Sequence, residues 1–254
     1  MLDFSFLNSP AILTVDTVFV NLSEYGSTYF FALLSGLYNT LLLTATTVSF
    51  SFVVSAAIFM LLHNNRALCN TFSFLFSIIK VIPVLGVVVL MYFGYMYWMS
   101  VWESVSIGGV AVLSMAGLTV PYFSNGIFLQ TEFLCLFLAL SVYTIPFIVD
   151  ILMSAYQSMP ANNKKISDTL VSGTIKKFTV IYFPYTIDRA RSALTNQAVN
   201  LFKNSSLGVV IGYSELTNVG ITTLSITGKT IECFIIMSLV YFIVSLILSR
   251  FANR

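Results

Sequence analysis

Long apolar runs are the feature that most constrains how this chain can fold. Residues 29–62, 72–97, 128–152 and 231–249 are each apolar over about the 20 residues that a helix needs to cross a bilayer core. Of the 254 residues, 57% are hydrophobic and only 9% are charged, whereas soluble domains carry about 25% charged residues. Too few polar side chains remain to cover a water-facing surface. We therefore expect an all-α integral membrane protein.

Two further segments are ambiguous. Residues 105–123 are apolar but rich in Gly and Ser, and residues 190–213 are long enough to span but unusually polar. Lys and Arg favour the cytoplasmic side, and here they concentrate between residues 164 and 191 and at the C-terminus, with none before Arg66. This distribution predicts an N-terminus outside, a C-terminus inside and about five transmembrane helices. Residues 190–213 are then the fourth span and 105–123 a re-entrant or interfacial element; six spans with the N-terminus inside is the alternative.

The predicted organisation has three parts. Residues 1–28 form an N-terminal extracytoplasmic or interfacial segment, residues 29–250 one transmembrane domain, and residues 251–254 a cytoplasmic tail. Within the domain, residues 154–185 form a long basic amphipathic loop on the cytoplasmic side. Its lysines are equally suited to anionic lipid head groups and to docking a cytoplasmic partner.

Motifs for nucleotide chemistry are missing from the sequence. Neither GxxxxGK[ST] nor GxGxxG occurs, so an ATP-driven process would need a separate ATPase subunit. His63 is the only histidine, and a metal site needs several convergent ligands. The net charge of +2 is scattered between apolar blocks. We expect no enzyme activity, metal, cofactor or nucleic-acid partner for this chain itself.

The polar segment LTNQAVNLFKNSSLGVVIGYSEL, residues 194–216, stands out among the apolar runs. A lysine at the centre of a spanning helix costs about 2.5–3.5 kcal/mol, so Lys203 should face a partner or a watery cavity. Asn196, Gln197, Asn200 and Lys203 fall on one broad face of a helix. That face either lines a pathway for a zwitterionic amino acid or hydrogen-bonds to neighbouring helices.

This segment resembles the fourth-span signature of polar amino-acid ABC importer permeases of the histidine/glutamine/arginine type, approximately PxLTNQxxxLxKDTSLxxxIGxxEL. Here Asn204 replaces the usual Asp and Ser205 the usual Thr, and the proline is missing. Residues 36–44 resemble the GxxxTLLLT motif of the family. Lys80 and Pro83 open a segment similar to RGTPLLVQLxxxYFG, and residues 158–184 align with the coupling loop SVPxGQxEAAxALG…LP. The resemblance covers about residues 36–250.

The resemblance implies a type I ABC importer permease fold with a cytoplasmic coupling-helix loop. The chain would translocate polar amino acids by alternating access, as a multi-pass protein of the bacterial cytoplasmic (inner) membrane. Implied partners are a dimer of ABC ATPase subunits that bind ATP and Mg, a second permease copy or sister permease, an extracytoplasmic solute-binding protein, the amino-acid substrate and membrane lipid. The alternatives are an ATP-independent secondary transporter or channel, and a non-transporting scaffold with a degenerate coupling loop.

Two groups of candidate residues follow from the resemblance. In the coupling loop, the family's EAA triplet becomes residues 165–167 and its glycine becomes Val171. The residues expected to line or support the substrate pathway are Asn196, Gln197, Asn200, Lys203, Asn204, Ser205, Ser206, Lys80 and Pro83. Those expected to couple to the ATPase are Pro160, Lys164, Lys165, Ile166, Ser167, Leu170, Val171 and Pro184.

Overall fold

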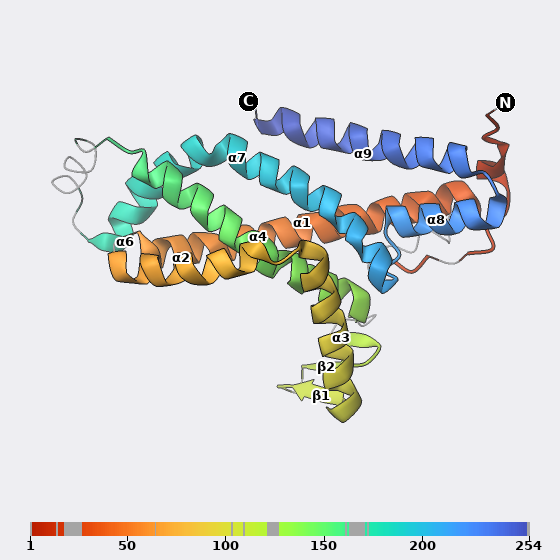
Figure 1. Cartoon of the computed structure of the whole chain (residues 1–254), viewed down its shortest axis with the longest axis horizontal. Coiled ribbons are helices and arrows are strands. Elements are labelled where there is room, and N and C mark those ends of the chain that lie inside the picture. Colours follow the sequence, from red (N-terminus) through yellow and green to blue (C-terminus); the bar gives the residue numbers. More distant parts are fainter. Residues whose placement is uncertain are drawn as a thin grey trace.

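Helices make up most of the structure, a computed structural model that describes residues 2–13, 15–17, 27–63, 65–102, 104–108, 110–120, 127–160, 162, 171 and 173–252. Long helices lie side by side along most of its length, and α3 (Val84–Trp102) points away from them (Figure 1). The other helices are η1 (Ser5–Asn8), α1 (Tyr29–Leu62), α2 (Arg66–Val81), α4 (Thr131–Gln157), α6 (Thr174–Lys177), η3 (Phe178–Tyr182), α7 (Phe183–Asn204), η4 (Ser205–Ile211), α8 (Leu216–Thr227) and α9 (Thr230–Ala252).

Four helices in the described part of the chain are long and apolar enough to cross a membrane: α1, α3, α4 and residues Thr230–Arg250 of α9. The chain is therefore a multi-pass membrane protein. The predicted spans 29–62, 128–152 and 231–249 coincide with α1, α4 and α9 to within five residues at each end. At 1.5 Å per residue, the 34 residues of α1 extend well beyond a bilayer core about 30 Å thick.

The predicted span 72–97 is divided between two helices at Pro83, and the second of them, α3, is long and apolar enough to cross a membrane. α2 ends at Val81, and Ile82 adopts an extended conformation with φ −73° and ψ 129°. Pro83 has no N–H to donate, and its ring disfavours the helical conformation of the residue before it. The chain therefore bends at this point. α2 stays beside the other long helices, where Phe76 packs with Leu62 and Val149, whereas α3 points away from them (Figure 1).

Residues 104–130 contain a small antiparallel sheet that the sequence analysis did not predict. Its strands are β1 (Ser104–Ile107), β2 (Ala111–Ser114), β3 (Gly117–Val120) and β4 (Ile127–Gln130), paired in chain order. Gly117 has φ +142°, and a Cβ there would overlap the carbonyl oxygen of Leu129. This turn therefore requires glycine. The other named elements of the described residues are helices, and the sheet occupies most of the element expected at 105–123.

The predicted fourth span, 190–213, is helical over most of its length. α7 runs into the 3₁₀-helix η4, which ends at Gly212 with φ +81°. A Cβ on Gly208 would lie 2.9 Å from a methyl group of Leu136, so this glycine allows η4 to approach α4 closely. The segment is too polar to be one of the four apolar spans, and its crossing of the membrane stays a prediction.

The N-terminal segment packs against the junction between α8 and α9. Phe6 of η1 is buried beside Tyr29 and Cys233. The Lys229 ammonium donates a hydrogen bond to an Asp3 carboxylate oxygen at 2.8 Å, and this bond holds the pKa of Asp3 well below its ordinary range. Residues far apart in the chain thus hold this segment in place.

Candidate functional site

The polar face of α7 packs against α4, and the two helices run antiparallel (Figure 1). Pro184 lies at the start of α7, directly after the π-helical turn η3, so the backbone is helical on both sides of a residue that has no N–H to donate. Leu201 is buried against Leu136 and Leu140 of α4. This packing turns the neighbouring polar residues of α7 toward the middle of α4.

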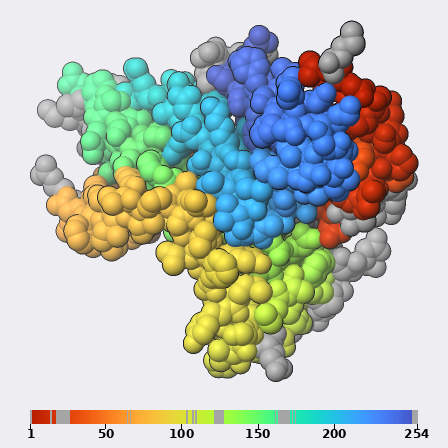
Figure 2. Space-filling view, turned by 45° about the vertical axis from the view of Figure 1, so that its right-hand side comes forward, coloured from red at the N-terminus to blue at the C-terminus, as the bar shows by residue number. Residues whose placement is uncertain are grey.

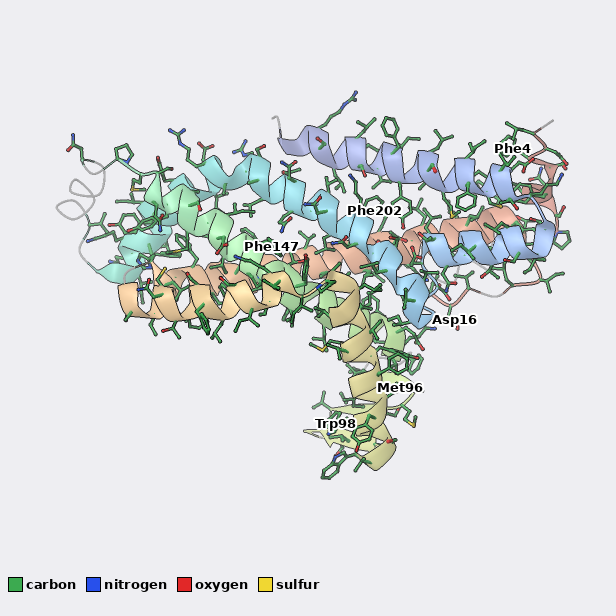
Figure 3. All side chains as sticks on the ribbon, in the orientation of Figure 1. Phe4, Asp16, Met96, Trp98, Phe147 and Phe202 are labelled. Carbon is green, nitrogen blue, oxygen red and sulfur yellow. The ribbon has the colours of Figure 1, made fainter. Side chains whose placement is uncertain are left out.

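A cavity of about 290 Å³ lies between these two helices. Its volume is near the lower end of the range of about 300–1,000 Å³ typical of ligand pockets, so it suits a small solute. Phe147, labelled on α4 in Figure 3, forms part of its wall. The lining comprises Tyr143, Thr144 and Phe147 of α4 with Gln197, Asn200, Leu201, Lys203 and Asn204 of α7.

The lining of this α4–α7 pocket combines one cation with several groups that donate and accept hydrogen bonds. The Lys203 ammonium and the amide nitrogens can donate to a carboxylate. Amide oxygens and the hydroxyls of Tyr143 and Thr144 can accept from an ammonium group. Asn200 Nδ2 donates to Gln197 Oε1 at 3.1 Å, which aligns these two amides. The pocket can therefore complement both charges of a small zwitterion.

The predicted pathway residues of α7 and η4 fall into two sets. Gln197, Asn200, Lys203 and Asn204 line the pocket, whereas Asn196 lies outside its lining. Asn200 and Lys203 are exposed, as is Asn196, so the pocket opens to the surface at these residues. The remaining two predicted residues are serines whose hydroxyls donate to the helix backbone. Ser205 donates to Phe202 O at 2.6 Å, and Ser206 donates to Lys203 O at 2.8 Å.

Lys80 reaches α4 from the end of α2. Its ammonium forms an ion pair with Asp150, and the same nitrogen lies 5.6 Å from the centre of the Phe147 ring. Since Phe147 lines the pocket, Lys80 lies just behind the pocket wall. The Lys80 side chain is 23% exposed and that of Asp150 is 52% exposed. Pro83 is exposed at the break that follows.

A second, more open hollow of about 420 Å³ continues along the same pair of helices. It involves later residues of α4 and earlier residues of α7, so it lies nearer to the coupling segment. Asp150 and Arg189 contribute charges of opposite sign to it. Its other lining residues are Ile151, Ser154, Ala155, Ser158, Ala190 and Ala193.

The structure describes three of the predicted coupling residues. Pro160 is exposed just after α4, Val171 is half-buried, and Pro184 is exposed in the first turn of α7. The remaining ones, Lys164, Lys165, Ile166, Ser167 and Leu170, lie outside the described residues.

The last part of the predicted coupling loop, residues 178–182, packs against the end of α1. The π-helix η3 places Phe178 with its ring centre 5.1 Å from that of His63, and Tyr182 at 5.9 Å. Phe59 of α1 and Tyr156 of α4 complete this aromatic cluster. These contacts connect η3 directly to the ends of α1 and α4.

The last residues of the polar motif anchor a turn. Glu215 is fully buried, and its carboxylate accepts hydrogen bonds from the backbone N–H groups of Thr217 and Asn218 and from the Tyr241 hydroxyl of α9. Its carboxylate therefore both caps α8 and ties α8 to α9.

Sequence reasoning missed the α4 half of the pocket. Tyr143, Thr144 and Phe147 have spacings of one and three residues, which place them on one side of a helix. Two neighbouring hydroxyl groups on one side of a mostly apolar span are a signal that could have identified them.

Sequence comparison finds similarity to permease proteins of amino-acid transport systems. No family model matches the chain. The general L-amino acid transport system permease protein AapQ of Rhizobium johnstonii is 35% identical over 130 residues, which are 51% of this chain and 32% of AapQ. The chain thus spans about a third of the length of that relative. The nopaline transport system permease protein NocM of Agrobacterium fabrum is 26% identical over 219 residues, 86% of this chain and 83% of NocM.

A solved structure matches the fold over nearly the whole chain. A crystal structure of an amino acid ABC transporter with histidines contains a chain that superposes with a TM-score of 0.67 at 21% identity, covering 95% of this chain and 97% of that one. At this identity the likeness shows the fold alone. The putative amino-acid ABC transporter permease protein YhdX of Escherichia coli is 33% identical over 132 residues, 52% of this chain and 34% of YhdX. The resemblance to amino-acid ABC transporter permeases is confirmed, in sequence by AapQ and YhdX and in fold by the solved structure.

Proposed function

We propose that this chain, which has the fold of a chain from an amino acid ABC transporter, is the transmembrane permease subunit of an ATP-driven importer of polar amino acids. The observation that carries the proposal is the α4–α7 pocket, because a lysine, three amides and two hydroxyls converge there on a volume suited to a small solute. AapQ is a permease protein of a general L-amino acid transport system and NocM one of a nopaline transport system, and the first of these supports this substrate class.

Different side chains of the pocket bind the two charged groups of the substrate. Lys203 binds the α-carboxylate of the substrate, and Gln197 and Asn200 add amide donors. Tyr143 and Thr144 offer hydroxyl oxygens to the substrate ammonium, while Phe147 packs against its aliphatic part. Because each charge finds a partner, the substrate does not lie unpaired at membrane depth, where an isolated charge is costly.

Transport follows from alternating access to this pocket. A pair of ABC ATPases binds ATP and Mg, and the coupling loop at residues 154–185 transmits closure of that pair through η3 to α1 and α4. A second permease, either a copy of this chain or a sister protein, completes the pathway in the bacterial cytoplasmic membrane. An extracytoplasmic solute-binding protein delivers the substrate. This chain itself catalyses no reaction.

The proposal can be tested by ligand binding to the detergent-purified complex. Each proteinogenic amino acid is added in turn, and the thermal unfolding temperature is measured, since a ligand that binds the native state raises it. Polar amino acids should raise it for the wild type and for the matched control Asn196→Ala, whose residue lies on the same helix outside the pocket. Polar amino acids should leave the unfolding temperature of the Lys203→Met variant unchanged. Equal stabilisation of both variants would refute this pocket as the binding site.

A further inference from the structure

The sheet formed by β1 to β4 is unusual because it bears no charge. Residues 104–130 include no Asp, Glu, Lys or Arg, although Glu103 and Glu132 lie on either side. Its surface exposes large apolar side chains instead, with Val112 39% exposed and Met115 and Phe128 each 45% exposed. Proteins normally place charges on exposed sheet edges to prevent unwanted pairing. Water is therefore a poor environment for this sheet.

The sheet is firmly attached to the ends of two helices that could span a membrane. The Tyr95 hydroxyl of α3 donates to Ser114 O at 2.6 Å. The Thr131 hydroxyl, at the start of α4, donates to Met115 O at 2.6 Å. The sheet is thus held at the point where α3 ends and α4 begins. Figure 2 shows the yellow and yellow-green atoms of α3 and the sheet standing out from the rest of this face of the molecule.

Both tryptophans of the chain lie at this same end of α3. Trp98 and Trp102 are the only two in the sequence, and their spacing of four residues places them on one side of the helix. They are 44% and 61% exposed, and Figure 3 labels Trp98 near the far end of α3. Tryptophan concentrates at membrane–water interfaces, where its ring is in apolar surroundings and its N–H reaches polar groups.

Two physical limits restrict where this sheet can lie. Among the described residues, the outer strands β1 and β4 each have one neighbour in the sheet. Unpaired backbone groups of an open edge are not tolerated in the hydrocarbon core. Its apolar, uncharged surface is equally unsuited to bulk water. The layer of lipid head groups and upper acyl chains satisfies both limits, because it supplies hydrogen-bonding groups beside apolar ones.

We propose that this sheet, together with Trp98 and Trp102, is a lipid-binding element that lies in the interfacial layer of the bilayer. The occupant of its exposed apolar surface is lipid. The element would fix the depth and tilt of α3 in the membrane. The inference holds whichever solute the protein transports, so its test is independent of the proposed function.

Fluorescence quenching by brominated lipids measures the depth of the two tryptophans. The full complex is reconstituted into nanodiscs of phosphatidylcholine with bromine either near the top of the acyl chains or near their ends. The double variant Trp98→Phe/Trp102→Phe supplies the background from partner subunits, and subtraction isolates the two tryptophans. Adding Phe242→Trp to that double variant gives a depth standard, because Phe242 is 60% exposed and central in α9.

The proposal predicts a larger loss of Trp98 and Trp102 fluorescence with the shallow bromine than with the deep one. The Phe242→Trp standard should show the opposite order. If both sites follow the order of the standard, the element lies in the hydrocarbon core and the proposal is overturned. Quenching by neither lipid would also overturn it, and aqueous acrylamide would then distinguish exposure to water from burial against a protein partner. The single variants Trp98→Phe and Trp102→Phe provide the same comparison if the double variant does not assemble.

Discussion

Gly36 allows α1 and α8 to approach closely, and its replacement by alanine should destabilise the fold. A Cβ at this position would lie 3.0 Å from Cγ2 of Val219, 3.1 Å from Cα of Leu216 and 3.2 Å from its backbone nitrogen. The Leu216 backbone is fixed because its N–H donates to the Thr40 hydroxyl at 3.0 Å. The strain of overpacking is about 1–3 kcal/mol, and alanine recovers about 0.5–1 kcal/mol of helix propensity. With the midpoints of these two ranges, the expected net loss is about 1 kcal/mol.

Gly94 provides the matched control. It lies within a helix, as Gly36 does, but a Cβ there would meet nothing within 4 Å. Gly94→Ala should therefore be neutral or stabilise the protein by up to about 1 kcal/mol. Gly220→Ala should fall between these two, because the atoms it meets belong to the flexible side chain of Met237. The assay is unfolding by SDS titration in mixed micelles. The reasoning is refuted if Gly36→Ala proves as stable as Gly94→Ala.

Three further predictions concern polar contacts. In a double-mutant cycle with Lys80→Met and Asp150→Asn, SDS unfolding should give a coupling energy of about 0.5–1 kcal/mol, because the pair is partly exposed; zero coupling would contradict the ion pair. Glu215→Gln should cost about 1–3 kcal/mol in the same assay, because one amide oxygen cannot replace two carboxylate oxygens that accept bonds from buried groups; an unchanged stability would count against this capping role. The hydrogen bond from Lys229 lowers the pKa of Asp3 below its ordinary value of 3.8. The stability that this bond contributes is therefore fully present above pH 3.8 and is lost as the pH falls further. At neutral pH, Asp3→Asn should speed hydrogen exchange in residues 2–13, and the difference from wild type should shrink at pH values below 3.8; a difference that does not change with pH would contradict the role of this charge.

Membrane-spanning helices could be predicted from the sequence wherever a long apolar run is uninterrupted. α1, α4 and α9 are continuous apolar runs, and a bilayer leaves such runs few alternatives to a helix. The run at 72–97 is equally apolar, but the local geometry of Ile82 and Pro83 divides it. Hydropathy describes side chains and not backbone conformation, so it does not reveal such a break. The sheet was missed because its four-residue strands are too short for an alternating pattern to stand out, and because glycine and serine in them suggested a loop.

Half of the candidate pocket could be predicted for a similar reason. Exposing Lys203 to lipid would cost free energy, so the side of α7 that carries it was expected to face a cavity or a partner. The other polar residues on that side of the helix could then be identified from their spacing. The other half depends on which helix packs against that side. Tyr143 and Phe147 belong to a span that is apolar overall, and only the antiparallel packing of α4 on α7 gives them a role. The hydroxyls of Tyr143 and Thr144 mark one side of α4, but nothing local in the sequence says that this side faces α7.

ATP-dependent uptake into proteoliposomes tests the central claim most directly. The chain is purified with its ABC ATPase and reconstituted, and accumulation of labelled polar amino acids is measured with and without ATP on the ATPase side, in the presence of the solute-binding protein. The account predicts co-purification of an ATPase and uptake that requires ATP, and Lys203→Met should abolish this uptake while Asn196→Ala preserves it. Failure of any ATPase to co-purify under mild conditions, or ATP-dependent uptake that is undiminished in Lys203→Met, would contradict it.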